Sequence, residues 1–440
     1  MSANGLICFT NCLLPQEDGS LVEKDLWIDE RRGVIVDAQR TFFLRKERPD
    51  KIVDLGGNIL SPGFIDIQIN GGFGFDFSVY DGDDQAYRDG LKLVAERIIE
   101  TGVTAIVPTI ITQEKSLYPK LLHLLRPWSP PNAAHLLGWH AEGPFLDMAK
   151  RGAHSPPLIM PASEGFKSFE SIYSAENLAE AEDWLMSCDI RQDTVGVRMI
   201  TAAPEVDGVM DAITEASKRG ICFNIGHSIA TTDIATAAVK NGARCITHLF
   251  NAMPQLHHRD PSIIGLLGAS PYLSTPISTY APFPSATLTE FERPFYEIIV
   301  DGIHSHPNSV RLAYSAHPDG CILITDAMKV LDPHLRDGVH EWRDGRKFYK
   351  EGDKLYVEGT TTLAGSVITL DKCVRNFSRF TGCSIGEAIK CATYTPAKCL
   401  RIENKKGTLR AGADADLVVL DRQGNVVSTW VKGKIAWERQ

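Results

Sequence analysis

A chain of 440 residues, 43% apolar and 23% charged, has the composition of a globular protein with two or three domains, or with one large barrel and an appended module. Its 55 acidic side chains exceed its 46 basic ones, and the net charge of −9 argues against partners such as nucleic acid or an anionic membrane surface. We find no apolar run long enough to span a membrane and no signal-peptide pattern, so we expect a cytoplasmic protein. The ten cysteines include no Cys-x-x-Cys pair, and we expect them to be reduced.

Both ends of the chain have the pattern of short strands separated by turns. The strands expected near the start are residues 26–29, 33–36 and 51–55, and those near the end are residues 416–420, 426–430 and 434–437. Because chain termini often lie close together, we expect one small β-sandwich domain made of residues 1–61 and 395–440. The segment between them, residues 62–394, forms the second domain.

The middle of the chain alternates short apolar runs with segments of helical periodicity. The runs that suit buried parallel strands are residues 64–69, 104–107, 136–139, 195–200, 222–225, 245–247, 297–300 and 322–325. The clearest helices are residues 84–101, 209–219 and 234–240. Eight strand–helix units predict a (β/α)8 TIM-like barrel. A doubly wound sheet is the alternative, but no Gly-x-Gly-x-x-Gly turn follows an early strand.

Two stretches fit no strand–helix unit. Residues 271–294 contain five prolines, and residues 332–358 are rich in charged and aromatic side chains. We expect both to be loop or hairpin insertions, to which the sequence assigns no function.

Metal-binding residue types follow three of the predicted barrel strands. Glu142, His227 and His248 come at the ends of the third, fifth and sixth strands, and these ends open onto one face of a barrel. One histidine at a strand end would be no more than a hydrogen-bonded loop residue. One carboxylate with two imidazoles, however, is the ligand set of a catalytic Zn²⁺ site that leaves a position for water. The same set also accepts Fe²⁺, Co²⁺ or Mn²⁺, so we expect one divalent ion, with Zn²⁺ first.

The aspartate after the eighth strand has two interpretations. Asp326 suits a helix N-cap, and beside a metal it suits the base that deprotonates water and later returns the proton. We rank the role of the base first, because hydrolysis at a metal needs one. The sequence leaves His140 and His306 undecided, and His140 is a candidate to contact a metal ligand.

Several motifs resemble those of a known family. Pro-Gly-Phe-Ile-Asp at residues 62–66, with a sandwich from both termini around a barrel, is similar to the amidohydrolase superfamily. More narrowly, the chain resembles the N-acetylglucosamine-6-phosphate deacetylases in residues 140–145, 226–228, 247–254, 301–304 and 363–366. The specific signal is His-Leu-Phe-Asn-Ala-Met-Pro at residues 248–254. The motifs occur in family order, and the resemblance covers nearly the whole chain.

The resemblance implies hydrolysis of the acetamide of N-acetyl-D-glucosamine 6-phosphate, which yields D-glucosamine 6-phosphate and acetate. It implies that Glu142, His227 and His248 bind the metal, that Asp326 is the base and then the acid, and that His154 polarises the acetamide carbonyl. The substrate-binding residues it implies are Ala153, His154, Asn251, Ala252, Arg259, Asp301, Gly302, Ile303, His304, Leu363, Ala364 and Gly365. Among these, residues 251–252, 259 and 304 would hold the phosphosugar, and residues 363–365 would line the acetyl end. A homodimer is also implied, with the phosphate site near its interface.

The cluster His257-His258-Arg259 supports the phosphate assignment independently, because a guanidinium suits bidentate recognition of phosphate. One departure concerns the first strand, where many superfamily members have His-x-His and this chain has Gln68-x-Asn70. Neutral amides replace imidazole poorly on Zn²⁺, so we expect a mononuclear site in which Gln68 and Asn70 are vestiges of a second metal position.

Two other functions are weighed against this one. The first is another mononuclear amidohydrolase, acting on a cyclic amide or an N-acyl amino acid. The second is an inactive scaffold that keeps the barrel for assembly, which the presence of all three ligand candidates and Asp326 argues against.

Overall fold

The structure is a computed structural model that describes residues 4–179, 196–270, 291–342, 345–360 and 363–440. Its largest part is a nearly closed barrel of eight parallel strands, in which each strand pairs with the next along the chain. The strands are β8 (Phe64–Ile69), β11 (Val103–Ile111), β13 (Gly138–Glu142), β14 (Val197–Ala202), β15 (Cys222–Ile225), β16 (Cys245–Ile246), β17 (Phe295–Ile299) and β18 (Cys321–Ile324). Where the ring closes, Asp326 N–H donates to the Gln68 carbonyl at 2.9 Å. The predicted barrel is confirmed.

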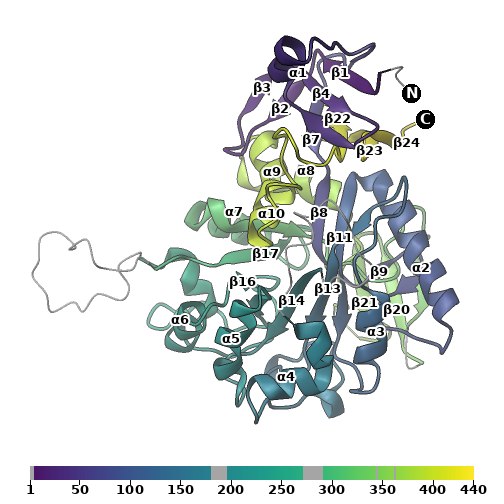
Figure 1. Ribbon diagram of the computed structural model, residues 1–440. Helices are drawn as coiled ribbons and strands as arrows, with labels where there is room; N and C mark the ends of the chain where they lie inside the picture. Colours follow the sequence, from purple (N-terminus) through teal and green to yellow (C-terminus); the bar gives the residue numbers. More distant parts are fainter. Residues whose placement is uncertain (1–3, 180–195, 271–290, 343–344, 361–362) are drawn as a thin grey trace, which may run out of the picture.

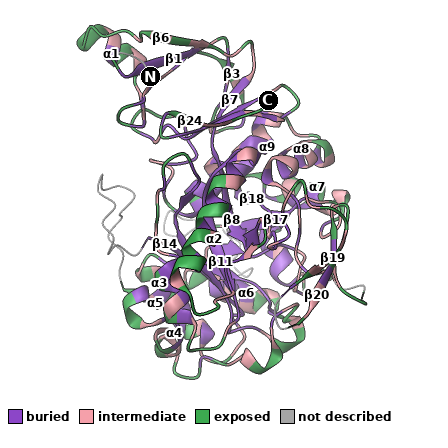
Figure 2. Cartoon of the chain, turned by 90° about the vertical axis from the view of Figure 1, so that its right-hand side faces the viewer, coloured by how far each residue is buried: buried purple, intermediate pink, exposed green. Residues whose placement is uncertain are grey.

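Helices cover the outside of the barrel, most of them between consecutive strands (Figure 1). They are α2 (Asp84–Arg97), α3 (Tyr118–Leu124), α4 (Phe166–Tyr173), α5 (Val209–Lys218), α6 (Thr232–Lys240), α7 (Pro307–Ala316) and α8 (Leu370–Thr381), followed by α9 (Ile385–Ala392) and α10 (Tyr394–Cys399). Short 3-10 helices are η1 (Ile98–Thr101), η2 (Met148–Lys150), η3 (Pro156–Leu158), η4 (Ala175–Leu178), η5 (Ile263–Gly268) and η6 (Pro318–Gly320). The strands inside this layer are buried along their length (Figure 2). Burial on both faces is why most of their residues are apolar, although each of several strands also carries a buried polar side chain.

The small domain combines strands from both ends of the chain, as expected. One sheet has the order β5-β4-β1-β6 and the other β24-β23-β22-β7-β2-β3. Their bounds are β1 (Leu6–Thr10), β2 (Leu13–Pro15), β3 (Leu21–Glu23), β4 (Leu26–Asp29), β5 (Val34–Val36), β6 (Lys51–Asp54), β7 (Ile59–Pro62), β22 (Leu417–Leu420), β23 (Val426–Val431) and β24 (Lys434–Glu438). A short helix, α1 (Ala38–Leu44), lies between β5 and β6.

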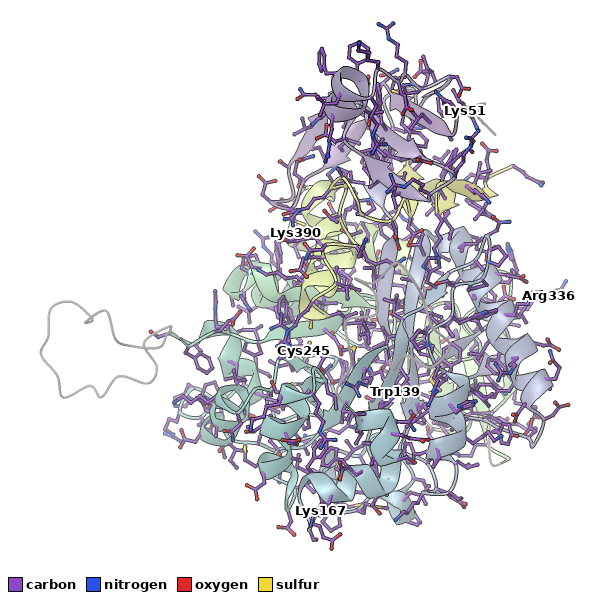
Figure 3. The ribbon with its side chains drawn as sticks, in the orientation of Figure 1. Lys51, Trp139, Lys167, Cys245, Arg336 and Lys390 are labelled. Atoms are coloured by element: carbon purple, nitrogen blue, oxygen red, sulfur yellow. The ribbon has the colours of Figure 1, made fainter. Side chains whose placement is uncertain are left out.

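Antiparallel pairing of β22 with β7 joins the two termini, and both ends of the chain lie in this domain (Figure 1). Phe9 and Trp430, from opposite ends of the sequence, pack edge to face at 5.1 Å between ring centroids. Figure 3 marks the two parts of the molecule with Lys51 in the small domain and Lys390, on α9, at the junction. The boundaries at residues 61 and 395 stay a prediction; α10, which contains the second, packs against β8 and β18.

Of the two insertions, residues 271–290 of the first lie outside the described residues. The second holds a three-stranded antiparallel sheet, β19 (Gly338–Glu341), β20 (Lys347–Glu351) and β21 (Lys354–Val357). Smaller elements are β9 (Gly71–Gly72), β10 (Phe75–Asp76) and β12 (His135–Leu136). The described cysteines are all free, and among the described helices none is long and apolar enough to cross a membrane.

The second barrel strand shows why the predicted boundaries were too narrow. The apolar run suggested residues 104–107, whereas β11 continues to Ile111 through Pro108 and Thr109. Pro108 lies where the pairing with β8 shifts register, so its missing N–H costs less than it would in a regular ladder. The fourth strand also moves, from the predicted 195–200 to Val197–Ala202; residue 195 lies outside the described residues.

Candidate active site

The carboxyl ends of four barrel strands hold the predicted metal ligands and the predicted base. Glu142 is the last residue of β13, His227 and His248 each follow their strand by two residues, and Asp326 follows β18 in the same way. All except Asp326 are at most 5% exposed. The barrel therefore gathers at one end residues that are up to 184 positions apart in the sequence.

Three donor atoms of this group converge on one point. Glu142 Oε1 lies 3.0 Å from His227 Nε2 and 3.1 Å from His248 Nε2, and the two ring nitrogens are 3.0 Å apart. A tetrahedral Zn²⁺ with ligand bonds of about 2.05 Å holds its ligand atoms about 3.3 Å apart, close to this spacing. The donor set therefore fits a divalent ion in both chemistry and spacing.

The hydrogen bond on the far side of His227 prepares it as a ligand. His227 Nδ1 lies 2.7 Å from the carbonyl oxygen of Lys150, which accepts hydrogen bonds only. Nδ1 therefore bears the proton and donates it to the carbonyl, and in the neutral ring Nε2 presents its lone pair to the cluster.

Electrostatics also favour a charged carboxylate at the centre of the cluster. Burial disfavours the ionised form of Glu142, but its contacts with His227 and His248 outweigh burial and hold its pKa well below the usual value. For His248, burial lowers the pKa and Glu142 raises it, with a net increase to about 9. The pocket thus stabilises positive charge beside Glu142, as a cation site requires.

Three of these residues have backbone angles that L-residues rarely adopt. The φ angles are 49° at His227, 28° at His248 and 46° at Asp326. Such conformations cost on the order of 1–3 kcal/mol each and persist only where surrounding structure enforces them. Because all three strained residues follow strand ends at the site, we infer that the strain is kept to direct their side chains into it.

Asp326 is held by an amide from the first strand. Asn70 Nδ2 donates to Asp326 Oδ1 at 2.7 Å, and Asp326 is half-buried just after β18. Burial, followed by the charge of Glu142, raises its pKa to about 6. The helix-cap interpretation is wrong, because an isolated β-bridge at Ala327, and not a helix, follows Asp326.

The neighbouring amide holds the other carboxylate. Gln68 Nε2 donates to Glu142 Oε1 at 3.2 Å. Gln68 and Asn70, which the sequence suggested only as vestigial metal positions, thus contact one candidate ligand and the candidate base. Amides serve here as uncharged donors that leave the carboxylates ionised.

His154 stands at the edge of the cluster, with its Nε2 3.9 Å from Glu142 Oε2. The backbone N–H of Thr112 donates to His154 Nδ1 at 3.3 Å, and the Thr112 hydroxyl lies 2.8 Å from the same nitrogen. Because Nδ1 accepts, the proton of the neutral ring is on Nε2, on the side of Glu142. His154 is therefore set up as a hydrogen-bond donor into the site.

The residues that the resemblance assigns to the phosphosugar lie on two loops. Asp301 accepts from the backbone N–H groups of Ile303 and His304, and its other oxygen lies 2.6 Å from His304 Nδ1. Asp301 thereby fixes the loop around Gly302 and the orientation of the His304 ring. In the loop after β16, the Asn251 side chain donates to the carbonyls of residues 248 and 249, and Ala252 has a φ of 50°.

Arg259 is not brought into this group. Its side chain is exposed, and within the described part of the chain no hydrogen bond or ion pair joins its guanidinium to Asn251, Ala252 or His304. Of the remaining predicted residues, Ala364 belongs to an apolar cluster against which Ala153 packs, Gly365 lies beside the Asp326 backbone, and Leu363 pairs with Tyr356.

Sequence reasoning missed Thr112 and the Lys150 carbonyl. Thr112 directly follows the second barrel strand, so its place at a strand end was a usable signal. The carbonyl gives no signal in the sequence. His140, left undecided, is buried with Nε2 2.7 Å from the Thr201 hydroxyl, and burial lowers its pKa to about 4. Its hydrogen bond runs to Thr201 and not to a candidate ligand.

Comparison with known proteins agrees with this barrel and identifies the family. A model of the amidohydrolase family matches residues 59–436. The N-acetylglucosamine-6-phosphate deacetylase of Homo sapiens is 41% identical over 98% of this chain and 95% of its own, and that of Bacillus subtilis is 32% identical over 86% and 85%. A Mycobacterium smegmatis deacetylase, solved in complex with N-acetyl-D-glucosamine-6-phosphate, aligns with a TM-score of 0.74 at 25% identity over 98% of both chains.

The chain belongs to the amidohydrolase family and, within it, to the N-acetylglucosamine-6-phosphate deacetylases.

Proposed function

We propose that this protein hydrolyses the acetamide of N-acetyl-D-glucosamine 6-phosphate to D-glucosamine 6-phosphate and acetate. The observation that carries the proposal is that Glu142 Oε1, His227 Nε2 and His248 Nε2 lie within 3.1 Å of one another. Family membership gives that cluster its reaction class, since relatives over nearly the full length are deacetylases of this substrate.

We infer that the cofactor is one divalent ion, Zn²⁺ first, held by Glu142, His227 and His248. When bound, such an ion lowers the pKa of water toward about 7 and polarises a carbonyl. Gln68 keeps Glu142 in place through its hydrogen bond, and the Lys150 carbonyl keeps the His227 ring in the binding tautomer.

Asp326 transfers the protons in the reaction, and His154 donates a hydrogen bond to the substrate. Asp326 accepts a proton from the attacking water as the new C–O bond forms at the acetamide carbon. His154 Nε2–H donates to the carbonyl oxygen as negative charge develops there. Asp326 then transfers its proton to the amine nitrogen as the C–N bond breaks, which leaves acetate and a free amine. Asn70 orients Asp326 through both transfers.

The phosphate is bound by the loops at residues 251–252 and 301–304. The backbone N–H of Ala252 and the ring of His304 supply donors, Asp301 fixes that ring, and the Asn251 N–H holds the loop by donating to the His248 carbonyl. Arg259, exposed on the surface, binds phosphate across the interface of a homodimer. We infer the dimer from the family resemblance, and the exposed position of Arg259 leaves it accessible to a second subunit.

The test is release of acetate by the purified protein, measured with and without added Zn²⁺. Phosphorylated and unphosphorylated N-acetylglucosamine are compared, with an N-acetyl amino acid as the competing substrate. We expect metal-dependent acetate release that depends strongly on the phosphate. Equal rates on the unphosphorylated sugar, or faster release from the N-acetyl amino acid, would overturn the substrate assignment.

A further inference from the structure

The insertion sheet shares an apolar cluster with the active-site loops. Apart from the main core, the buried side chains Met328, Val330, Trp342, Phe348, Leu355 and Ala364 form a cluster that we name the insertion core. Ala153, the residue before His154, packs against it. Three of its members, Trp342, Phe348 and Leu355, come from the insertion. Met328 and Val330 follow Asp326 in the chain, and Ala364 belongs to residues 363–365. The insertion is therefore built into the site and does not stand apart from it.

Backbone hydrogen bonds connect the sheet to the loop that carries Asp326. Ala364 N–H donates to the Leu355 carbonyl on β21 at 3.1 Å. Two residues further on, Ser366 N–H donates to the Asp326 carbonyl at 3.1 Å, and Met328 N–H donates back to Ser366 at 3.0 Å. Residues 363–366 thus act as a bridge, fixed on one side by the insertion and on the other by the catalytic loop.

The contact at Gly365 shows how closely the insertion core approaches the backbone of Asp326. A Cβ added to Gly365 would lie 2.6 Å from Met328 Cγ and 3.2 Å from the Asp326 carbonyl oxygen. The Met328 side chain therefore lies directly against residue 365, beside the base. Behind it, Trp342 and Phe348 stack with ring centroids 4.4 Å apart. Met328, Trp342 and Phe348 thus form an apolar wall. Ala153, the residue before His154, packs against this cluster, and the Asp326 backbone lies beside it.

We propose that the insertion core is the back wall of the acyl pocket, and that Met328 and Trp342 limit the length of the N-acyl group that this enzyme hydrolyses. The inference rests on the proposed function, because the scissile carbonyl lies between His154 and Asp326 only if these two act on it. The acyl substituent of that carbonyl is apolar, and the insertion core is the apolar surface that flanks both residues. Acetyl fits, and each further methylene meets Met328.

The experiment compares N-acetyl-, N-propionyl- and N-butyryl-glucosamine 6-phosphate as substrates of the full-length enzyme. In Met328→Ala we expect the ratio of kcat/KM for propionyl over acetyl to rise about tenfold, which is the size of effect that one methylene has in an apolar pocket. Trp342→Leu, one layer further back, shifts the ratio in the same direction by a smaller factor. The matched control is Tyr349→Ala, on the same strand as Phe348 but 43% exposed on its other face, which leaves the ratio unchanged.

The outcomes separate this inference from the proposed function. Wild-type enzyme that releases no acetate from the acetyl substrate would overturn the function. If the wild type is active and Met328→Ala changes the rates for all three acyl groups by the same factor, the wall is elsewhere and the inference is wrong. If Met328→Ala fails to fold, as judged by its thermal melt, Met328→Leu and Trp342→Leu provide the same comparison of ratios.

Discussion

Two clusters of histidine and carboxylate side chains in this protein differ in whether they contain a cation of their own. In the active-site cluster Glu142 contacts His227 and His248, and the second cluster has His135 with Asp414 and Asp416. In the second cluster, the Lys406 ammonium lies 2.7 Å from His135 Nδ1, 2.7 Å from Asp414 and 2.5 Å from Asp416. In the first, the described residues place no lysine or arginine side chain against the ligand atoms.

The difference shows that histidines and carboxylates in close proximity do not by themselves make a metal site. Burial opposes the charge on Lys406, but Asp414 and Asp416 outweigh it and raise its pKa to about 12. The second cluster therefore contains its own cation, which offsets one of its two carboxylate charges without a ligand. It joins β12, at the end of the barrel away from Glu142, to the C-terminal segment of the small domain. Among the described residues, the first cluster has no such cation, and its donor atoms could bind a metal ion.

Chelation should give the largest effect, because it breaks the active-site cluster alone. We expect treatment with a strong chelator to abolish acetate release, and one equivalent of Zn²⁺ to restore it. The measurement pairs metal content with activity. Activity that survives in protein shown to be metal-free would remove the distinction between the two clusters.

Asp326→Asn should leave the active-site cluster intact while removing its base. The amide is nearly the same size and still contacts Asn70, but it cannot accept the proton of water. We expect kcat to fall about 10²–10⁴-fold, the usual contribution of a general base. Metal content is the control and should equal that of the wild type. Near-normal turnover would contradict the assignment of Asp326.

Lys406→Met removes the cation of the second cluster and leaves Asp414 and Asp416 without it. Because removing one partner strands buried charge, we expect the free energy of unfolding to fall by about 3–5 kcal/mol. Denaturant unfolding measures the loss, and kcat at a temperature where the variant is folded should be unchanged. Adding Asp416→Asn should recover part of the stability. A variant with wild-type stability would mean that the cluster is well solvated.

Gln68→Met gives the smallest expected effect. It sharpens the comparison of the two clusters because it removes a hydrogen bond to Glu142 while all three candidate ligands stay in place. The hydrogen bond to Oε1 is lost while side-chain volume is kept. Partners of metal ligands typically contribute about 10–100-fold in affinity, and we expect a loss in that range for Zn²⁺. Competition with a chelating dye measures the affinity. Unchanged affinity would show that Gln68 is only a vestige of a second site.

The sequence predicted most of this fold because parallel barrel strands are buried on both faces and stand out as apolar runs. It also predicted Glu142, His227 and His248, since polar residues at the ends of such runs are conspicuous. It did not predict what Gln68 and Asn70 do. Their hydrogen bonds to Glu142 and Asp326 cross between strands, and the closure of the ring that brings β8 beside β18 leaves no local pattern.

By itself, the sequence determined the barrel, the domain made from both termini, the family and the set of residues that could bind a metal. These follow from local apolar periodicity and from motifs that can be read along the chain. Only the tertiary structure decided which histidine–carboxylate group needs an external ion, because Lys406 approaches His135 from 271 positions away. Only the tertiary structure joined the second insertion to Asp326. Both depend on contacts between distant segments, which packing in three dimensions creates.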